Sequence, residues 1–563
     1  MKVVIIGGVA GGATAAARIR RLDERAEIVM LERTGYVSYA NCGLPYFIGG
    51  EIEEESELTL QTPASFFARY RVDVRVLHEA LSIDRGRREV LVKDLKSGQT
   101  YAEKYDKLLL SPGAKAVVPR GAHTEDGRVF TLRTVEDTFA IHRFVEERAP
   151  RRAVVVGGGF IGLEVAENLM RKGVRVTLIQ RGEQVLAPLD KDMAAFLHAE
   201  LLRRRVGLRL GESFERVETQ PFCVVTDKGR YEADFTVIAV GVAPESELAR
   251  EAGLALGVKG SIAVDARMRT SDPDIYAVGD AVEVRQFVTN EKTLIALAGP
   301  ANKQGRIAAD NICGIESEYR GSQGSSVVRV FSLTAAATGI NEKTARAQGI
   351  AYEKVVLSPN SHASYYPGAQ VMTMKVLYKK DTLRLLGAQI VGGEGVDKRI
   401  DVLATAIRAG LPAPALTDLD LAYAPPFSSA KDPVNMAGYL IENLVTGKVK
   451  QFHVEDMDAL PRDGSVTLLD ARTPREYARG HAEGFGNLPL DELRSRLAEV
   501  ERGKPVYVMC QSGLRSYLAC RILAQNGYEC YNFSGGYRFY DAVRRGSAQA
   551  LSAYPCGMER RGE

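Results

Sequence analysis

Two strand–glycine–helix units in the first half of the chain restrict the possible fold more than any other feature. The first begins at Val3 (VVIIGGVAGGATAAARIRRL) and the second at Arg152 (RAVVVGGGFIGLEVAENLMRKG). In each unit a short apolar run leads into glycines and then into a helix-periodic stretch, which is the pattern of a buried parallel strand in a βαβ unit. A further apolar strand follows each helix, ending near Glu32 and at Gln180. The sequence therefore predicts two nucleotide-binding domains.

The second unit carries a complete glycine motif, Gly157-x-Gly159-x-x-Gly162. The first glycine permits a tight turn, the second lets the backbone approach a pyrophosphate, and the third allows close packing of helix on strand. Free N–H groups at the start of the helix add to the attraction for phosphate. Because a strand precedes the motif and a helix follows it, we predict a dinucleotide site.

The first unit departs from the same pattern, because Val9 replaces the middle glycine. Small residues still surround the turn, and Glu32 lies at a distance along the chain that suits a carboxylate binding a ribose hydroxyl. The loop glycines are Gly7, Gly8, Gly11 and Gly12.

The equivalent of Glu32 in the second unit is Gln180, and Arg181 follows it. Without a carboxylate there is no repulsion of a 2′-phosphate, and Arg181 could pair with one. This slightly favours NADPH over NADH. A surface arginine in a domain that accepts both cofactors explains the pair nearly as well.

The composition is that of an ordinary globular protein. At about 150 residues per domain, 563 residues suggest three or four domains, and 45% are hydrophobic and 26% charged. The 74 basic residues nearly balance the 71 acidic ones, which argues against a nucleic-acid partner. No apolar run approaches membrane-spanning length, and the amino terminus has the pattern of a strand and turn. We expect a soluble cytoplasmic protein without a membrane partner.

Seven cysteines are scattered along the chain, and no pair has CxxC spacing. A zinc ribbon, a thioredoxin-type dithiol and a disulfide framework are therefore not supported. We expect no metal site, and cysteines that act singly. The positions are Cys42, Cys223, Cys313, Cys510, Cys520, Cys530 and Cys556.

Together with DIYAVGDA near residue 280, the two units resemble the pyridine nucleotide–disulfide oxidoreductase flavoproteins, from Lys2 to about Lys448. The resemblance implies FAD in the first unit and NAD(P)H in the second. Phe160 would gate access of the nicotinamide to the flavin, or equally would pack in the core. The implied FAD-binding residues are Gly7, Gly8, Gly11, Gly12, Glu32, Gly113 and Asp280, and the NAD(P)-binding residues are Gly157, Gly159, Phe160, Gly162, Gln180, Arg181 and Gly241.

Cys42 lies in SYANCGLPYFIGG, and Phe47 stands where many members of the superfamily have a second cysteine. An intramolecular disulfide is excluded there, which leaves a mixed disulfide, a sulfenic acid or a persulfide on Cys42. The segment resembles the coenzyme A disulfide reductase group, which also includes NADH peroxidases and oxidases.

Two further segments, HASYYPGA and LAYAPPFSSAKDPVNMAGY, agree with that group. The resemblance implies that Tyr423 and Tyr365, or Tyr366 in its place, reach the active cysteine of a partner subunit, where a phenol could donate a hydrogen bond to a leaving thiolate. This implies a homodimer. Interface packing is the alternative role for the tyrosines.

Thr14, Arg18 and Arg21 share one face of the first helix, because they are spaced i, i+4 and i+7. Arginines on one face suit the phosphates of coenzyme A. The resemblance implies a coenzyme A site that also includes Ser38, Asn41, Arg71, Asn302 and Lys431.

The tail, with VTLLDARTPREYARGHAEGFGNLPL and PVYVMCQSGLRSYLACRIL, resembles a rhodanese (sulfurtransferase) domain. Cys510 is expected to end a strand, and the loop after it to lead into a helix from about Ser516. Such a loop directs N–H groups inward and can hold a thiolate or a persulfide sulfur. The loop residues are Gln511, Ser512, Gly513, Leu514 and Arg515. The sequence thus predicts two reactive cysteines, each in an anion-stabilising loop, and five that have no chemical role.

The fold class is therefore predicted as α/β, with two Rossmann-like domains, an α+β dimerisation domain and an α/β rhodanese-like domain. The expected boundaries are 1–115 with 247–325, 116–246, 326–446 and 447–563. The expected activity is FAD-dependent reduction by NAD(P)H of coenzyme A persulfide, polysulfide or disulfide at Cys42, coupled to sulfur transfer by Cys510, with release of thiol and hydrogen sulfide. A peroxide- or oxygen-reducing enzyme that cycles Cys42 through sulfenic acid is the alternative, and a sulfide-sensing scaffold is a third.

Overall fold

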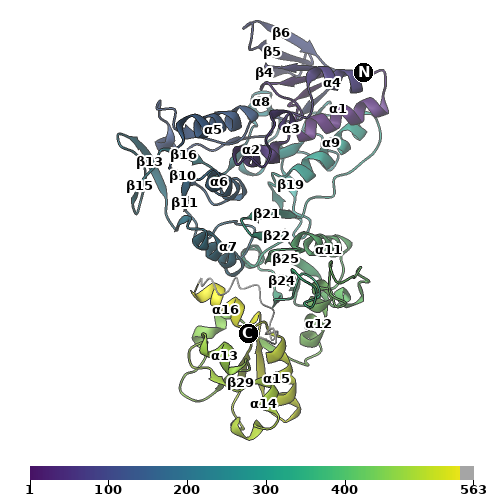
Figure 1. The fold of residues 1–563 in the computed structure, drawn as a ribbon. Helices are drawn as coiled ribbons and strands as arrows, with labels where there is room; N and C mark the ends of the chain where they lie inside the picture. Colours follow the sequence, from purple (N-terminus) through teal and green to yellow (C-terminus); the bar gives the residue numbers. More distant parts are fainter. Residues whose placement is uncertain (546–563) are drawn as a thin grey trace. The chain divides into compact units, whose positions relative to one another are not determined.

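A computed structural model describes residues 1–545 of the chain. Residues 546–563, which include Cys556 and the end of the predicted last domain, lie outside the described residues. The chain divides into two compact units, Met1–Gly182 with Arg209–Gly324, and Glu183–Leu208 with the residues from Ser325 onward. Figure 1 shows the elements coloured along the sequence.

The first unit contains two parallel sheets of the predicted nucleotide-binding type. One has the strand order β18-β7-β1-β2-β3 and the other β12-β11-β10-β16-β9. Their central strands are almost wholly buried and rich in Val, Ile and Leu, as expected of strands covered on both faces. The first sheet consists of β1 (Lys2–Ile6), β2 (Glu27–Glu32), β3 (Asp73–Val76), β7 (Lys107–Leu110) and β18 (Ile275–Ala277), and the second of β9 (Val129–Phe130), β10 (Arg152–Val156), β11 (Arg175–Gln180), β12 (Gly207–Leu210) and β16 (Phe235–Ile238).

A helix begins directly after each glycine loop, as the two motifs predict. These are α1 (Ala10–Leu22), which packs along α9 (Ala298–Ile312), and α6 (Phe160–Arg171). The remaining helices are α2 (Leu44–Ile48), α3 (Glu55–Leu58), α4 (Pro63–Tyr70), α5 (Val135–Arg148) and α8 (Glu247–Glu251).

Small antiparallel sheets complete the first unit. They are formed by β4 (His78–Asp84), β5 (Glu89–Asp94) and β6 (Thr100–Lys104); by β13 (Phe214–Thr219), β14 (Phe222–Thr226) and β15 (Arg230–Glu232); by β8 (Ala114–Ala116) and β17 (Val242–Pro244); and by β19 (Val284–Arg285) and β20 (Lys292–Thr293).

The second unit begins with an antiparallel sheet of order β21-β22-β25-β24-β23, in which β23 is an edge strand. Its strands are β21 (Ser326–Val330), β22 (Leu333–Gly339), β23 (Tyr352–Leu357), β24 (Met372–Lys379) and β25 (Leu385–Gly392). The accompanying helices are α7 (Lys191–Arg203), α10 (Glu342–Ala347), α11 (Val396–Ala409) and α12 (Pro433–Val445).

The tail forms a separate parallel sheet of order β26-β30-β29-β27-β28 within the second unit. Its strands are β26 (Lys450–Phe452), β27 (Thr467–Asp470), β28 (Gly486–Asn487), β29 (Val506–Met509) and β30 (Cys530–Phe533), and its helices are α13 (Pro474–Ala478), α14 (Leu490–Leu493), α15 (Leu514–Gln525) and α16 (Gly536–Arg545). The predicted α/β fold class is confirmed in all its parts.

Candidate active sites

The first glycine loop is a tight turn in which Gly7 and Gly12 leave no room for a side chain. Gly7 adopts φ +98°, and a Cβ added there would lie 2.0 Å from the Ser111 carbonyl oxygen. A Cβ on Gly12 would lie 1.9 Å from the Gly7 carbonyl oxygen. The Gly8 N–H donates to Glu32 Oε2 at 2.8 Å, so the buried carboxylate at the end of β2 lies directly beside the loop.

The second glycine loop repeats this geometry. Gly157 adopts φ +112°, and a Cβ on Gly162 would lie 1.8 Å from the Gly157 carbonyl oxygen. Around Gly159, in contrast, no atom lies within 4 Å of such a Cβ. The backbone is therefore open at the position where the motif predicts approach of a pyrophosphate. The Gly158 N–H donates to Gln180 Oε1 at 2.9 Å, which mirrors the Glu32 contact.

The other predicted nucleotide residues lie at loop ends around these sheets. Asp280 accepts a hydrogen bond from the Arg133 guanidinium at 2.7 Å. Arg133 was missed by the sequence analysis, because it lies far from every motif. Phe160 is half-buried as the first residue of α6. Arg181 is exposed, and Gly113 and Gly241 both have positive φ.

Cys42 is exposed, in a short 3₁₀ turn (Asn41–Gly43) between the first loop and α2. The Ser38 N–H donates to the Gly8 carbonyl at 2.8 Å and so ties this segment to the first glycine loop. Burial raises the pKa of the Cys42 thiol, the carboxylates of Glu164 and Asp280 raise it further, and Arg133 lowers it. That the loop around Cys42 stabilises an anion stays a prediction.

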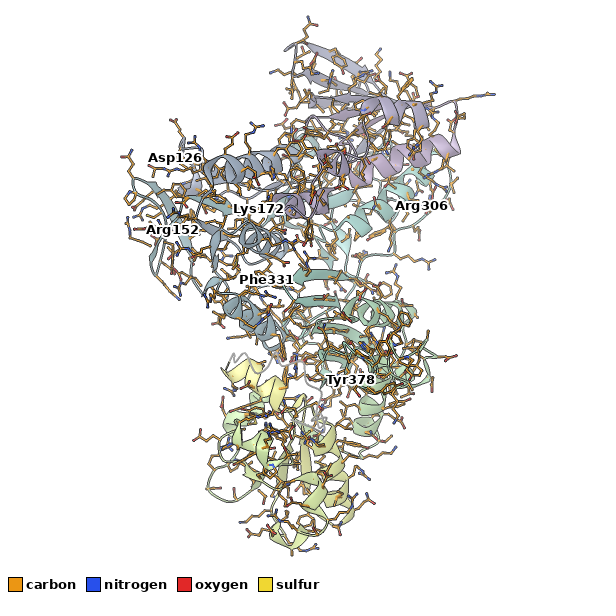
Figure 2. All side chains as sticks on the ribbon, in the orientation of Figure 1. Asp126, Arg152, Lys172, Arg306, Phe331 and Tyr378 are labelled. Atoms are coloured by element: carbon orange, nitrogen blue, oxygen red, sulfur yellow. The ribbon has the colours of Figure 1, made fainter. Side chains whose placement is uncertain are left out.

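The predicted face of α1 is directed toward α9. Thr14 Oγ1 donates to Asn302 Oδ1 at 2.8 Å, and Arg18 Nε donates to Asp310 Oδ1 at 2.7 Å. Arg21 is exposed. Arg306 lies between Asn302 and Asp310 at helical spacing and is also exposed (Figure 2). Arg306 was missed as a candidate phosphate-binding residue, although its i, i+4 spacing from Asn302 could have indicated it.

The remaining predicted coenzyme A residues belong to both units: Asn41 and Arg71 to the first, and Lys431 to the second. Asn41 is half-buried beside Cys42, and Lys431 is exposed just before α12. Arg71 is exposed at the C-terminal end of α4, where it adopts a left-handed conformation and its guanidinium lies over the Phe67 ring.

The structure brings together two of the three predicted tyrosines. The hydroxyls of Tyr365 and Tyr423 lie 3.0 Å apart, although 58 positions separate them in the chain. Tyr365 is 72% exposed, Tyr423 45% and Tyr366 42%. Tyr366 instead packs on the His362 ring. Which of the two tyrosines reaches a partner's cysteine stays a prediction.

Cys510 follows β29 directly and is fully buried. Its Sγ accepts hydrogen bonds from the Gly513 N–H and the Ser516 hydroxyl, both at 3.2 Å. Helix α15 begins at Leu514, slightly before the expected start, so the predicted loop is a compact turn capped by Gly513. Ser516 was missed, because the motif suggested main-chain donors alone.

Two charged pairs frame this loop. Arg472 contacts both carboxylate oxygens of buried Asp470 and donates to Gln511 Oε1 at 3.3 Å. Arg515 pairs with Glu476 at 2.6 and 2.7 Å. The positive charge of Arg515 is thus compensated by Glu476 of the same domain.

The six cysteines within residues 1–545 are all unpaired. Cys520 and Cys530 lie in the hydrophobic core of the tail, where the Cys530 thiol donates to the Cys520 carbonyl at 3.2 Å. This agrees with the structural role expected of them.

A family model described as pyridine nucleotide-disulphide oxidoreductase matches residues 1–305. The chain belongs to this family. The family's dimerisation domain matches residues 325–433, which indicates a homodimer, and a rhodanese-like domain matches residues 453–542. The predicted resemblance is thereby confirmed for all three parts.

Curated relatives and solved structures agree with this assignment. Coenzyme A disulfide reductase of Staphylococcus haemolyticus (strain JCSC1435) is 37% identical over 446 residues, which is 79% of this chain and 100% of the relative. The crystal structure of reduced Bacillus anthracis CoADR-RHD has a TM-score of 0.94 at 47% identity, covering 96% of this chain and 98% of that one. A NAD-dependent persulfide reductase from A. fulgidus has a TM-score of 0.90 at 38% identity, covering 96% and 100%.

As a member of this family, the chain is an oxidoreductase that uses FAD and NAD(P)H. The two glycine loops fit these groups, because each closes around main-chain atoms and places a side-chain oxygen on a loop N–H, and the second is open at Gly159. Among residues 1–545, no helix has the length and apolar character needed to cross a membrane.

Proposed function

We propose that this oxidoreductase reduces coenzyme A persulfide, polysulfide and coenzyme A disulfide with NAD(P)H, and that its tail transfers sulfane sulfur. The observation that carries the proposal is that one chain contains both an exposed cysteine, Cys42, and a buried one, Cys510, in separate domains. Cys42 is exposed to substrate, and Cys510 is enclosed by donors to its sulfur. The similarity to a coenzyme A disulfide reductase and to a persulfide reductase, each over most of its length, supports both halves.

The reductive half acts through the Cys42 thiolate. With coenzyme A disulfide, this sulfur attacks one substrate sulfur, a Cys42–coenzyme A disulfide forms and one coenzyme A thiolate leaves. With a persulfide, the terminal sulfur passes to Cys42 and the thiolate leaves. Two electrons and a proton then regenerate Cys42 and release thiol or hydrogen sulfide. FAD, reduced by NAD(P)H, supplies those electrons when bound, held by the loop glycines, Glu32 and Asp280.

Residues of the chain position the other parts of this reaction. Arg21 and Arg306 offer exposed charge to the phosphates of coenzyme A, whereas Arg18 is already paired with Asp310. The paired hydroxyls of Tyr365 and Tyr423 would donate to a leaving thiolate on the partner subunit. The remaining residues that we propose to hold coenzyme A are Thr14, Ser38, Asn41, Arg71, Asn302 and Lys431.

The tail acts through Cys510 without net oxidation or reduction. Its thiolate attacks the terminal sulfur of a polysulfide, the sulfur–sulfur bond of the donor breaks, and a Cys510 persulfide forms while the shortened polysulfide anion leaves. The Gly513 N–H and Ser516 hydroxyl stabilise negative charge on this sulfur. The persulfide then passes its terminal sulfur to coenzyme A or to Cys42.

The test is anaerobic NAD(P)H oxidation with coenzyme A persulfide, coenzyme A disulfide and hydrogen peroxide, in wild type, Cys42→Ser and Cys510→Ser. We expect Cys42→Ser to abolish turnover of both coenzyme A substrates. Faster turnover of peroxide than of either coenzyme A substrate would instead favour the peroxidase alternative. Polysulfide-supported turnover that is unchanged in Cys510→Ser would exclude the sulfur relay.

A further inference from the structure

The antiparallel sheet β21-β22-β25-β24-β23 is called the dimerisation sheet below. The tail domain is attached to its edge through main-chain groups of the edge strand β23. The Val356 N–H donates to Ser534 Oγ at 3.0 Å, and Gln451 Nε2 donates to the Lys354 carbonyl at 2.6 Å. Edge strands carry main-chain groups that no neighbouring strand satisfies. Here two side chains of the tail, Ser534 and Gln451, form hydrogen bonds with such groups. Ser534 is only 3% exposed.

The turn after Ser534 is enclosed on both sides. Gly535 adopts φ +90°, and a Cβ added there would lie 2.9 Å from Val356 Cγ1. Gly536 adopts φ +70°, and a Cβ there would lie 2.5 Å from the Ser512 nitrogen. One glycine therefore faces the dimerisation sheet, and the next faces the loop that follows Cys510.

The same turn begins α16, whose first N–H groups bind the cysteine loop. The Tyr537 N–H donates to the Cys510 carbonyl at 2.6 Å, and the Arg538 N–H donates to the Gln511 carbonyl at 3.1 Å. A continuous path of hydrogen bonds and van der Waals contact thus runs from Val356 through Ser534 to Cys510.

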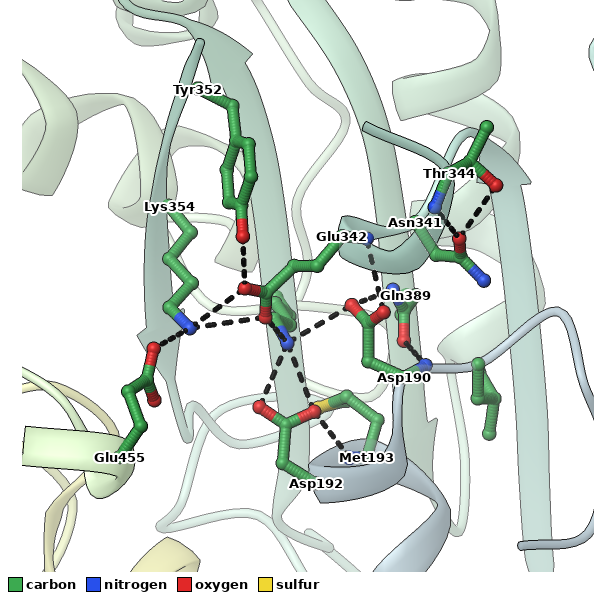
Figure 3. Close-up of polar contacts among 12 residues, drawn as sticks. Asp190, Asp192, Met193, Asn341, Glu342, Thr344, Tyr352, Lys354, Gln389 and Glu455 are labelled. Carbon is green, nitrogen blue, oxygen red and sulfur yellow. Dashed lines mark hydrogen bonds and ion pairs between the residues drawn. The ribbon is translucent and has the colours of Figure 1, made fainter. Parts of the chain in front are cut away.

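The dimerisation side of this path is held by a network of buried charges (Figure 3). Lys354, on β23, contacts Glu342 at 3.0 Å and also pairs with Glu455 of the tail. Lys375, on β24, is fully buried and contacts Asp192 at 2.8 Å. Removing one partner from such buried ion pairs is strongly destabilising, so this network ties β23 to α7, α10 and the start of the tail.

A second contact fixes the direction of α16. The Phe539 and Phe196 rings lie 6.3 Å apart between their centroids, and the Arg538 guanidinium lies 5.8 Å from the Phe196 ring. Helix α16 is therefore held against α7 as well as against the cysteine loop.

We propose that Ser534 is a positioning residue for the sulfur-transfer step. Its hydrogen bond to Val356 fixes the Ser534–Gly536 turn, and the turn fixes the main chain of the Cys510 loop, so the dimerisation sheet sets the geometry in which the Gly513 and Ser516 donors meet the sulfur. This inference rests on the proposed role of Cys510 as a sulfur carrier. It makes sulfur transfer at Cys510 depend on Val356, a residue of the dimerisation sheet.

The test uses the full-length holoenzyme with Ser534→Ala, Ser534→Thr, Gln451→Leu and, as a matched control, Ser495→Ala at an exposed serine of the same domain. Two readouts are followed: persulfide formation on Cys510 from polysulfide in a single turnover, and the rate of Cys510 alkylation as a function of pH. Reduction of coenzyme A disulfide through Cys42 is measured in every variant and should not change.

In Ser534→Ala we expect loading of Cys510 to fall about fivefold, the equivalent of one net hydrogen bond, with a displaced pH profile of alkylation. Ser534→Thr, which keeps the hydroxyl, should restore both, and Ser495→Ala should match wild type. Gln451→Leu removes a docking bond without touching the turn and should leave the pH profile unchanged.

Wild-type loading and pH profile in Ser534→Ala would overturn the proposal, and so would equal changes in Gln451→Leu, because they would show that docking in general is responsible. The alkylation profile reports on loop geometry even if Cys510 does not feed the reductase. Failure of the relay, seen with Cys510→Ser, is therefore distinguishable from failure of this inference.

Discussion

The two cysteines that we propose to react, Cys42 and Cys510, lie in contrasting surroundings. Cys510 is buried, and the two hydrogen-bond donors to its sulfur come from the turn that follows it and from the first turn of α15. Cys42 is exposed, and the charges near it come from distant segments: Glu164 on α6, Asp280 beside β18, and Arg133 before α5.

The two surroundings act on the thiols in different ways. At Cys510 a short local segment supplies donors to the sulfur, so one motif is sufficient. At Cys42, burial and the carboxylates of Glu164 and Asp280 raise the pKa of the thiol. Formation of the thiolate there depends on positive charge from a bound cofactor, a substrate or the partner subunit. Four changes test this contrast, taken in order of the expected size of effect.

The largest effect is expected from Lys375→Met, which addresses the unit that holds Cys510. The change leaves buried Asp190 and Glu342, and half-buried Asp192, around an uncharged side chain. Removing one partner from buried ion pairs costs about 3–5 kcal/mol. Urea unfolding should show this loss in the transition of the second unit, while the alkylation rate of Cys42 stays the same. A loss below about 1 kcal/mol would mean that the cluster tolerates an uncompensated charge.

Glu342→Gln should cost less, about 2 kcal/mol at pH 7, because Lys375 keeps two other carboxylates. Burial raises the pKa of Glu342, but Lys375 and Lys354 lower it more, to about 2. A carboxyl whose pKa is lower in the folded state stabilises fully above its unfolded value near 4.5, and this stabilisation disappears as the pH falls toward 2. The difference between variant and wild type, measured by urea unfolding at several pH values, should therefore shrink below pH 4.5. A difference independent of pH would contradict the assigned charge state.

Ser516→Ala removes one of the two donors to the Cys510 sulfur. A hydrogen bond to a charged group contributes about 1.5 kcal/mol, so we expect roughly a tenfold slower formation of the Cys510 persulfide. Ser516→Thr should recover most of the rate. Coenzyme A disulfide reduction at Cys42 serves as the internal control, and an equal loss there would end the distinction between the two sites.

The smallest effect is expected from Glu164→Gln. This change removes one of the carboxylates that raise the pKa of Cys42, and the amide oxygen can still accept the hydrogen bond of the Tyr46 hydroxyl. Alkylation of Cys42 near pH 7 should become a few-fold faster, because without this carboxylate the pKa of the thiol is raised less and more thiolate is present. Cys510 alkylation provides the comparison. A slower reaction at Cys42 would show that Glu164 activates the thiol.

The sequence alone determined the features that depend on local geometry. Two glycine loops, the helices that follow them, and the turn after Cys510 could be predicted because tight turns and helix starts need particular residues at fixed spacings. The assignment of the nucleotide-binding and rhodanese-like domains followed from these segments, and that of the dimerisation domain from the resemblance to a known family. Local patterns were sufficient wherever the required contacts lie within a few residues.

Only the tertiary structure decided which distant residues meet. Arg133 pairs with Asp280, and the hydroxyl of Tyr365, rather than that of Tyr366, lies beside Tyr423. No spacing rule relates these positions, because their contacts depend on how helices and sheets pack. For the same reason the carboxylates near Cys42, and the path from Val356 to Cys510, could not be derived from any motif.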